Sequence, residues 1–190
     1  MQNEGAGKVE RYSSGGLVPG VVGLVLVAGT FGYGLFEPEA GFAPWAYPLC
    51  LLAGAAVWVV MVRPALRLHP DDVELRNILD SHRVPYALVT SVDIGHVTVV
   101  HAGDERYVGS GFGRGRRTMR QDKAASGDTP LEKRSTAWLI ENRIERRAQA
   151  ARDAASWSGA TSQVRHQWAW VEIGVLATLA VATLVAALVG

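Results

Sequence analysis

The chain has 190 residues, of which 48% are hydrophobic, with a formal net charge of +1 and a single cysteine, Cys50. The near-zero net charge gives no reason to expect a nucleic-acid partner, and one cysteine excludes an intrachain disulfide bond. The hydrophobic residues stand in long blocks, which is typical of a membrane protein rather than of one soluble domain.

The chain begins with a polar segment and a long apolar one. Residues 1–16 are rich in glycine, and we expect them to form a disordered or surface-lying cytoplasmic tail. Residues 17–36 carry no charge and, at about 1.5 Å per residue, are long enough to cross a ~30 Å hydrocarbon core as a helix. A signal peptide is the alternative, since Lys8 and Arg11 precede this stretch. However, the stretch is longer than a signal-peptide core and no A-x-A site follows it.

Two further apolar stretches predict transmembrane helices. The acidic link 37–43 can only be a tight turn, and the second helix, 45–62, follows it and ends at Arg63. The third, 169–189, is interrupted only by Glu172 in its first turn, where a carboxylate can reach the membrane interface. The predicted fold class is a membrane protein with three transmembrane α-helices, the first two of which form a hairpin over 17–62.

Small residues at one-turn spacing predict close helix packing. Gly16, Gly20 and Gly23, followed by Ala28 and Gly32, form such a row along the first helix. A second row would let the third helix pack closely on the hairpin, although an alanine-rich composition also produces such rows by chance. This second row consists of Gly174, Thr178, Ala182, Ala186 and Gly190.

The basic residues are distributed very unevenly along the chain. The tail has two, the link 37–43 has none, and the segment 63–166 has the remaining seventeen of the nineteen Lys and Arg residues. The positive-inside rule therefore predicts a multi-pass plasma-membrane protein with its N-terminus and middle segment in the cytoplasm, and with the acidic link and the C-terminus outside.

The segment 63–109 is the part of the chain that looks like a run of short strands. Alternating polarity on both sides of Pro70 and Asp71 predicts a hairpin. Farther along, β-branched residues on both sides of a Gly103-Asp104 turn signal predict a meander. The predicted strands are 65–69, 72–76, 90–95, 96–101 and 105–108.

A glycine-rich basic loop, 109–123, follows the strands, and together they form a predicted β domain over 63–128. Thr129 as N-cap, Pro130 in the first turn and Glu132 then predict the start of a helix over 129–158. One face of this amphipathic helix carries a narrow apolar stripe. The stripe consists of Ala137, Ile140, Ile144, Ala148, Ala151 and Ala155.

Four pieces of sequence carry a resemblance to a known family: RP directly after the hairpin, then LRLHPDDVELRN, RVPYALVTSVD and VVHAGDERYVG. Through them, residues 63–109 resemble the bacterial PH-like (pleckstrin-homology-like) domains of small membrane proteins of the actinobacterial type. Tyr86 stands where that family usually has tryptophan. The resemblance implies a small antiparallel barrel or sandwich capped by a C-terminal helix, and it implies little about activity because a fold does not determine a function.

Two segments are candidates for contact with lipid phosphates. In eukaryotic lipid-binding members of the fold, the loop between the first two strands is basic, but here residues 70–72 are Pro-Asp-Asp and would repel a phosphate. The basic loop is the better candidate, because each such charge near an anionic leaflet contributes about 1 kcal/mol. Alternatively, this loop stays solvated and only helps to set the topology. Its basic residues are Arg114, Arg116, Arg117, Arg120 and Lys123.

No motif predicts a catalytic residue, a metal site or a cofactor. The glycines of 109–113 lack the βαβ context of a dinucleotide-binding loop. His96 and His101 fall on opposite faces of one predicted strand, and His69 and His82 have no partner at ligand spacing. Beyond one phenylalanine, the basic loop has no aromatic platform for nucleic acid.

The sequence therefore favours a non-catalytic interaction module whose cytoplasmic PH-like domain contacts a protein partner, anionic membrane lipids or both. An accessory or assembly subunit of a larger membrane complex, such as a respiratory or envelope complex, is the alternative, with the membrane helices carrying the binding. A transporter or channel component fits less well, because three spans with one peripheral carboxylate offer no ion path.

Overall fold

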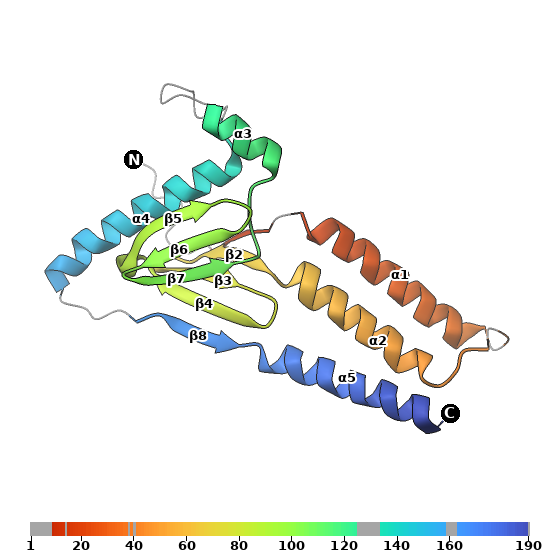
Figure 1. The fold of residues 1–190 in the computed structure, drawn as a ribbon. Coiled ribbons are helices and arrows are strands. Elements are labelled where there is room, and N and C mark those ends of the chain that lie inside the picture. Colours follow the sequence, from red (N-terminus) through yellow and green to blue (C-terminus); the bar gives the residue numbers. More distant parts are fainter. Residues whose placement is uncertain are drawn as a thin grey trace. The chain divides into compact units, whose positions relative to one another are not determined.

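The computed structural model describes residues 9–13, 15–37, 39, 41–124, 134–158 and 163–189, with the side chains of 121–124 and 156–158 outside the described part. The chain divides into two compact units (Figure 1). The β unit consists of Met1–Ser14 and Pro64–Gln167, and the helical unit consists of Gly15–Arg63 and Trp168–Gly190. Each unit is therefore interrupted in sequence by the other.

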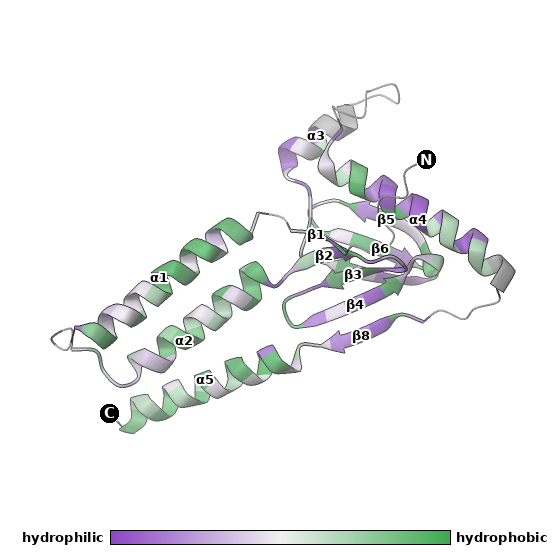
Figure 2. Cartoon of the chain, turned by 180° about the vertical axis from the view of Figure 1, so that it is seen from behind, coloured by the Kyte–Doolittle hydropathy of each residue, from purple (hydrophilic) through white to green (hydrophobic). Residues whose placement is uncertain are grey.

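The helical unit contains the apolar stretches of the sequence. Its helices are α1 (Leu17–Phe36), α2 (Ala46–Val57), which continues as a π-helical turn η2 (Trp58–Val62), and α5 (Trp170–Val189). By length and composition, α1 and α5 can each cross a membrane, whereas Ala46–Val62 is a shorter apolar helix. Figure 2 shows that hydrophobic residues predominate along all three helices, as expected of helices that expose apolar side chains to lipid.

The predicted small-residue packing is confirmed for the first part of the first helix but not farther along, where Ala28 is exposed and a Cβ at Gly32 would meet no atom within 4 Å. A Cβ added at Gly20 would lie 2.9 Å from a methyl carbon of Val62, and a Cβ added at Gly23 would lie 3.2 Å from a methyl carbon of Val57. At Gly16 it would lie 2.8 Å from the carbonyl oxygen of Met61. These glycines allow α1 to approach η2 and α2 more closely than larger residues would.

The β unit has two antiparallel sheets. One has the strand order β1-β2-β3-β4-β8 and the other β5-β6-β7. The bounds of the first sheet are β1 (Glu10–Tyr12), β2 (Ala65–Leu68), β3 (Asp72–Arg76), β4 (Asp80–Pro85) and β8 (Arg165–Trp168). Those of the second are β5 (Val89–Ile94), β6 (Thr98–Ala102) and β7 (Glu105–Gly109), and a 3-10 turn, η3 (Tyr86–Leu88), joins β4 to β5.

Two helices complete the β unit, α3 (Arg116–Ala124) and α4 (Thr136–Ser158). The apolar stripe predicted on α4 packs into the core, since Ala137, Ile140, Ile144 and Ala148 are all buried. The strands contribute alternate residues to the same core, as a sheet with one buried face requires. These residues are Leu66, Leu68, Val73, Leu75, Val84, Val89, Val92, Ile94 and Val100, together with Tyr86 of η3.

The structure confirms the predicted hairpin and meander and corrects the sequence analysis at the ends of segments. Residues 10–12, expected in a polar tail, form β1 and pair with β2. The helix expected from Thr129 begins at Thr136, where Ser135 accepts a hydrogen bond from the Trp138 amide as its N-cap. Residues 129–132 lie outside the described part of the chain.

Further corrections concern segments that were expected to lack regular structure. Part of the basic loop forms α3, and β4 and β8 were not predicted at all. The strand β4, DSHRVP, contains charged residues and ends in proline, so its pattern is weak. The four residues of β8 are all exposed, so β8 carries no apolar pattern.

Candidate functional site

The β unit has a groove of about 960 Å³, which we call the α4 groove. One wall is the alanine-rich face of α4, and the other comes from the β2–β3 turn, β4 and η3. The residues before β8 close one side. It is lined by Pro70, Asp71, Asp72, Arg83, Pro85, Tyr86, Ala87, Arg147, Ala150, Ala151, Ala154, Ala155, Gln163, Val164 and Arg165.

Two polar atoms of groove residues have no hydrogen-bond partner within the described part of the chain. They are Oδ1 of Asp72, an acceptor, and Nε of Arg83, a donor. Both atoms are shielded from solvent by the protein, and buried polar atoms are normally satisfied, so a bound water molecule would account for either of them. The other polar atoms of Asp72 and Arg83 give the groove lining one carboxylate and one guanidinium group.

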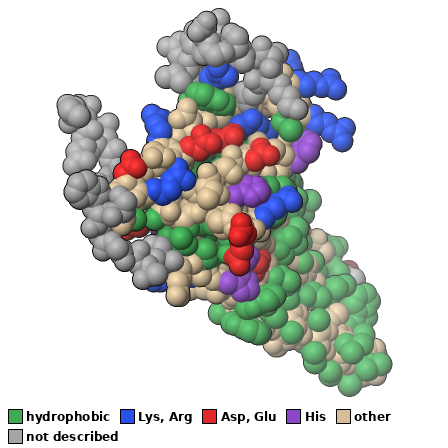
Figure 3. All heavy atoms as spheres, turned by 60° about the vertical axis from the view of Figure 1, so that its left-hand side comes forward, with side chains coloured by type: hydrophobic (Ala, Val, Ile, Leu, Met, Phe, Trp, Pro, Cys, Tyr) green, Lys and Arg blue, Asp and Glu red, His purple; other side chains and the backbone are tan. Residues whose placement is uncertain are grey.

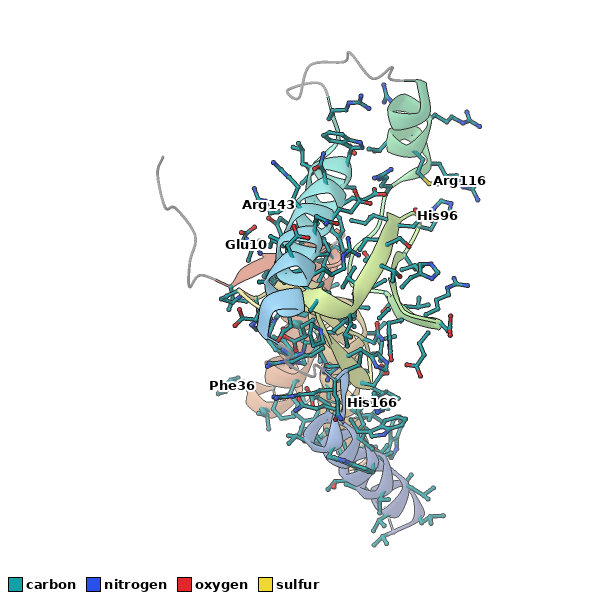
Figure 4. All side chains as sticks on the ribbon, turned by 90° about the vertical axis from the view of Figure 1, so that its left-hand side faces the viewer. Glu10, Phe36, His96, Arg116, Arg143 and His166 are labelled. Atoms are coloured by element: carbon teal, nitrogen blue, oxygen red, sulfur yellow. The ribbon has the colours of Figure 1, made fainter. Side chains whose placement is uncertain are left out.

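The wall formed by α4 is held in place by an ionic network around Glu10 of β1. Arg147 donates to Glu10 at 3.0 Å and to the Tyr86 hydroxyl at 3.4 Å, and Arg143 forms a further ion pair with Glu10. Burial raises the pKa of the Glu10 carboxyl, but the hydrogen bond from Tyr12 and the charges of the two arginines outweigh it, so the pKa lies below its ordinary value. Burial raises the pKa of Tyr86, and the charge of Arg147 only partly opposes this shift. Figure 4 shows Glu10 close to Arg143 on α4.

The predicted lipid-contacting residues do not act as one group. Arg114 forms a half-buried ion pair with Glu141 of α4, so its charge is used inside the β unit. Burial raises the pKa of the Glu141 carboxyl above its ordinary value, and the nearby Arg114 lowers it only in part. Arg116, Arg117 and Arg120 are exposed on α3, and the side chain of Lys123 lies outside the described part.

The glycines next to this basic segment have a structural explanation. A Cβ at Gly111 would lie 2.1 Å from the backbone nitrogen of Ala65, and one at Gly113 would lie 2.0 Å from the carbonyl oxygen of His96. Both contacts are far inside van der Waals distance and involve backbone atoms. The glycines therefore allow the segment after β7 to pack against β2 and the β5–β6 turn.

In the helical unit, the row of small residues on α5 that was expected to pack on the hairpin lies mostly on the exposed face of the helix. Gly174, Thr178 and Ala182 are exposed and only Ala186 is half-buried, while Gly190 lies outside the described residues. The helix does pack against α2, and its half-buried positions are Glu172, Ile173, Leu176, Leu179, Thr183 and Ala186. Leucine and isoleucine rather than glycine thus dominate the half-buried face of α5.

Glu172 has a specific partner that the sequence did not indicate. Its Oε1 lies 2.8 Å from Nε of Arg63, the residue that ends the hairpin, and the side chain of Arg63 is only 4% exposed. Such a pair, between a buried arginine and a carboxylate, links the hairpin to α5 by a charge-assisted hydrogen bond.

The sequence offered His82 no partner at ligand spacing, but the structure places two potential metal-ligating side chains near it. Residues Asp80 and His82 of β4 meet His166 of β8, and each of the three offers a donor atom within 4.8 Å of the others. We call this group the β4–β8 cluster. His166 is distant in sequence and lies in a strand without an apolar pattern, so no spacing rule could have found it. His69 instead lies 2.9 Å from Glu74, and His96 precedes β6 in a bend.

Comparison with known proteins places the chain in no family. No protein family model, curated protein sequence or solved structure matches it.

Proposed function

We propose that this chain is a non-catalytic, membrane-anchored interaction module. In this proposal the spans 17–36, 45–62 and 169–189 hold the β unit at the cytoplasmic face, with the N-terminus inside and the C-terminus outside. Two membrane-length apolar helices and the concentration of basic residues in 63–166 support this arrangement.

The β unit is proposed to be PH-like. Support comes from its strand order, because four antiparallel strands, β1–β4, are followed by three, β5–β7, and then by α4 packed on the core. A small sandwich capped by a C-terminal helix is what the resemblance of residues 63–109 implies. The departures are β1, which the hairpin separates from β2 in sequence, and the additional strand β8.

The observation that carries the function is the lining of the α4 groove, which contains a hydrogen-bond acceptor, the carboxylate of Asp72, and a donor, the guanidinium group of Arg83. An extended peptide offers an N–H donor and a C=O acceptor at each residue, and so matches both groups, whereas a lipid phosphate offers only acceptors. The groove also has an apolar wall of alanine and proline that could receive small side chains. The proposed ligand is therefore an extended segment of a partner protein.

This proposal is tested with a photo-crosslinking amino acid placed in the full-length protein in its native host. At Ala154, an exposed position that lines the groove, illumination should give a discrete adduct of higher mass. At Asp104, in the exposed turn between β6 and β7, it should give none. The adduct at Ala154 should weaken when Asp72→Ala and Arg83→Ala are introduced. Equal yields at both positions, or no adduct at Ala154, would contradict the proposal.

A lipid contact through α3 is a second part of the proposal, now restricted to Arg116, Arg117 and Arg120 because Arg114 pairs with Glu141. Three exposed charges near an anionic leaflet would contribute about 3 kcal/mol in total at moderate salt. In nanodiscs, a fluorescent probe at Thr118 should respond to anionic but not to zwitterionic lipid, and salt should suppress the response. A response that is the same in both lipids would exclude this contact.

The accessory-subunit alternative is favoured by one observation, the exposure of Gly174, Thr178 and Ala182 on α5. A row of small residues that faces away from the hairpin is available to a helix of another protein. If this alternative holds, partners should co-purify stoichiometrically in mild detergent, and Gly174→Leu with Ala182→Leu should release them. Purification of a homogeneous monomer would contradict it.

A further inference from the structure

The β4–β8 cluster brings two imidazoles to one carboxylate oxygen. Asp80 and His82 are two positions apart on β4, so their side chains project from the same face of the strand. Nε2 of His82 lies 2.8 Å, and Nε2 of His166 lies 3.4 Å, from Oδ2 of Asp80. The two imidazole rings stack with their centroids 4.6 Å apart, and the ring of Tyr107 lies on His82 with centroids 5.3 Å apart.

We propose that Asp80, His82 and His166 bind a divalent transition-metal ion, with Zn²⁺ the best match. A tetrahedral zinc ion with bonds of about 2.0 to 2.1 Å holds its ligand atoms about 3.3 Å apart. The two separations from Asp80, 2.8 and 3.4 Å, bracket that value, and all three donor atoms lie within 4.8 Å of one another. Small shifts of the side chains would therefore bring the three donors to zinc-bonding distance of one point.

The donor types select the class of ion. Imidazole nitrogen suits zinc, copper, nickel and iron, whereas Ca²⁺ and Mg²⁺ prefer ligand shells made of oxygen. Three protein ligands leave a fourth position for water or another ligand. The side chains are 25% (Asp80), 21% (His82) and 39% (His166) exposed, so solvent and an ion can reach them. Figure 3 shows histidine and acidic side chains at the surface of the molecule.

The same contacts would arise without an ion if Asp80 simply accepted hydrogen bonds from both histidines. An ion differs in its consequence, because it would replace these contacts with stronger bonds between β4 and β8. A single residue, Ala169, separates β8 from α5. Metal binding would thus fix the segment that connects the β unit to α5.

The test uses the full-length protein in mild detergent, without a polyhistidine tag and stripped of metal by a chelator. Calorimetric titration with Zn²⁺ should show one ion bound per chain, and Ca²⁺ or Mg²⁺ should not compete. The Zn²⁺ affinity should fall by at least about tenfold in each of three variants, His82→Ala, His166→Ala and Asp80→Asn. Removing a residue that only supports a metal ligand already lowers affinity by about tenfold or more, so removing a ligand itself should cost at least as much. His96→Ala is the matched control, since His96 and His166 lie at opposite ends of the β unit (Figure 4), and it should bind like the wild type.

Two further measurements distinguish the loss of a metal ligand from the loss of β8 itself. Each variant is melted without metal, so that a loss of affinity counts only where the melting temperature is unchanged. In addition, Co²⁺ added to the wild type should give the intense visible absorption of a four-coordinate site, and Zn²⁺ should displace it. A wild-type protein that binds no Zn²⁺, that gives only the weak six-coordinate Co²⁺ spectrum, or that loses as much affinity through His96→Ala as through His82→Ala would overturn the proposal.

Discussion

At the scale of single residues, the β unit depends on carboxylates that each face several cations. Oε2 of Glu74 on β3 lies 2.9 Å from His69, 3.7 Å from Arg67 and 3.8 Å from Arg83. Burial raises the pKa of Glu74, but the hydrogen bond from His69 and the two arginines outweigh it, so the pKa is lowered. Glu10 has the same role between β1 and α4. Both carboxylates therefore stabilise the fold in their ionised form.

The first prediction concerns Glu10→Gln. Because the pKa of Glu10 is below its ordinary value of 4.5 in the folded protein, its stabilisation is complete above pH 4.5 and is lost as the pH falls through the lowered pKa. The substitution should cost about 1 kcal/mol at neutral pH and cost less in acid. Thermal unfolding of the purified protein, followed by tryptophan fluorescence between about pH 3 and 7, measures this difference.

Glu145→Gln is the control for that prediction, because Glu145 is an exposed glutamate on α4, the helix whose arginines pair with Glu10. This substitution should change the free energy of unfolding by no more than about 0.5 kcal/mol. If Glu10→Gln and Glu145→Gln gave the same pH profile, the ionic network around Glu10 would not stabilise the β unit.

At the scale of elements, the five-stranded sheet of the β unit has two short edge strands, each of which precedes a long apolar helix in the sequence. The strand β1 precedes α1 and pairs with β2, and β8 precedes α5 and neighbours β4. Three or four residues are too few to be stable alone, so each depends on side chains from elsewhere. For β1 these are the arginines of α4 and Phe112, whose ring centroid lies 6.0 Å from that of Tyr12.

The second prediction concerns the close contact between the segment after β7 and β2. Gly111→Ala would place a methyl carbon 2.1 Å from the backbone nitrogen of Ala65, which can move only with the strand. The expected destabilisation is at least about 1 to 3 kcal/mol, the usual cost of overpacking. In the same loop, Gly115→Ala meets only Thr118 Oγ1 at 4.0 Å and should be nearly neutral. Chemical unfolding compares the two variants, and equal stabilities would show that the loop is not packed as described.

At the scale of the whole molecule, the chain passes between the two units at three points. These follow residues 14, 63 and 167, so the helical hairpin interrupts the β unit between β1 and β2. In the proposed topology, β1 and the strands that follow η2 must lie on the same side of the membrane, because they belong to one unit. The distribution of Lys and Arg predicts the cytoplasmic side for both.

The third prediction follows from this topology. In a Cys50→Ala background, which removes the single cysteine, Glu39→Cys should react with an impermeant thiol reagent in intact cells. Asp104→Cys, exposed in the β6–β7 turn, should react only after lysis. Labelling in the reverse order would invert the orientation, and labelling of both positions in intact cells would show that the two lie on the same side.

The sequence by itself determined those features that depend on neighbours along the chain. Two of the three predicted apolar runs of membrane length, the alternation of β2 and β3, the Gly103-Asp104 turn and the stripe on α4 are local patterns that the structure contains. Tertiary structure alone decided the rest, because contacts between distant segments leave no local pattern. It recruited residues 10–12 into a sheet, paired Arg63 with Glu172 and turned Arg114 inward to Glu141. It also brought His166 to Asp80 and His82, because β8 lies next to β4 in the five-stranded sheet.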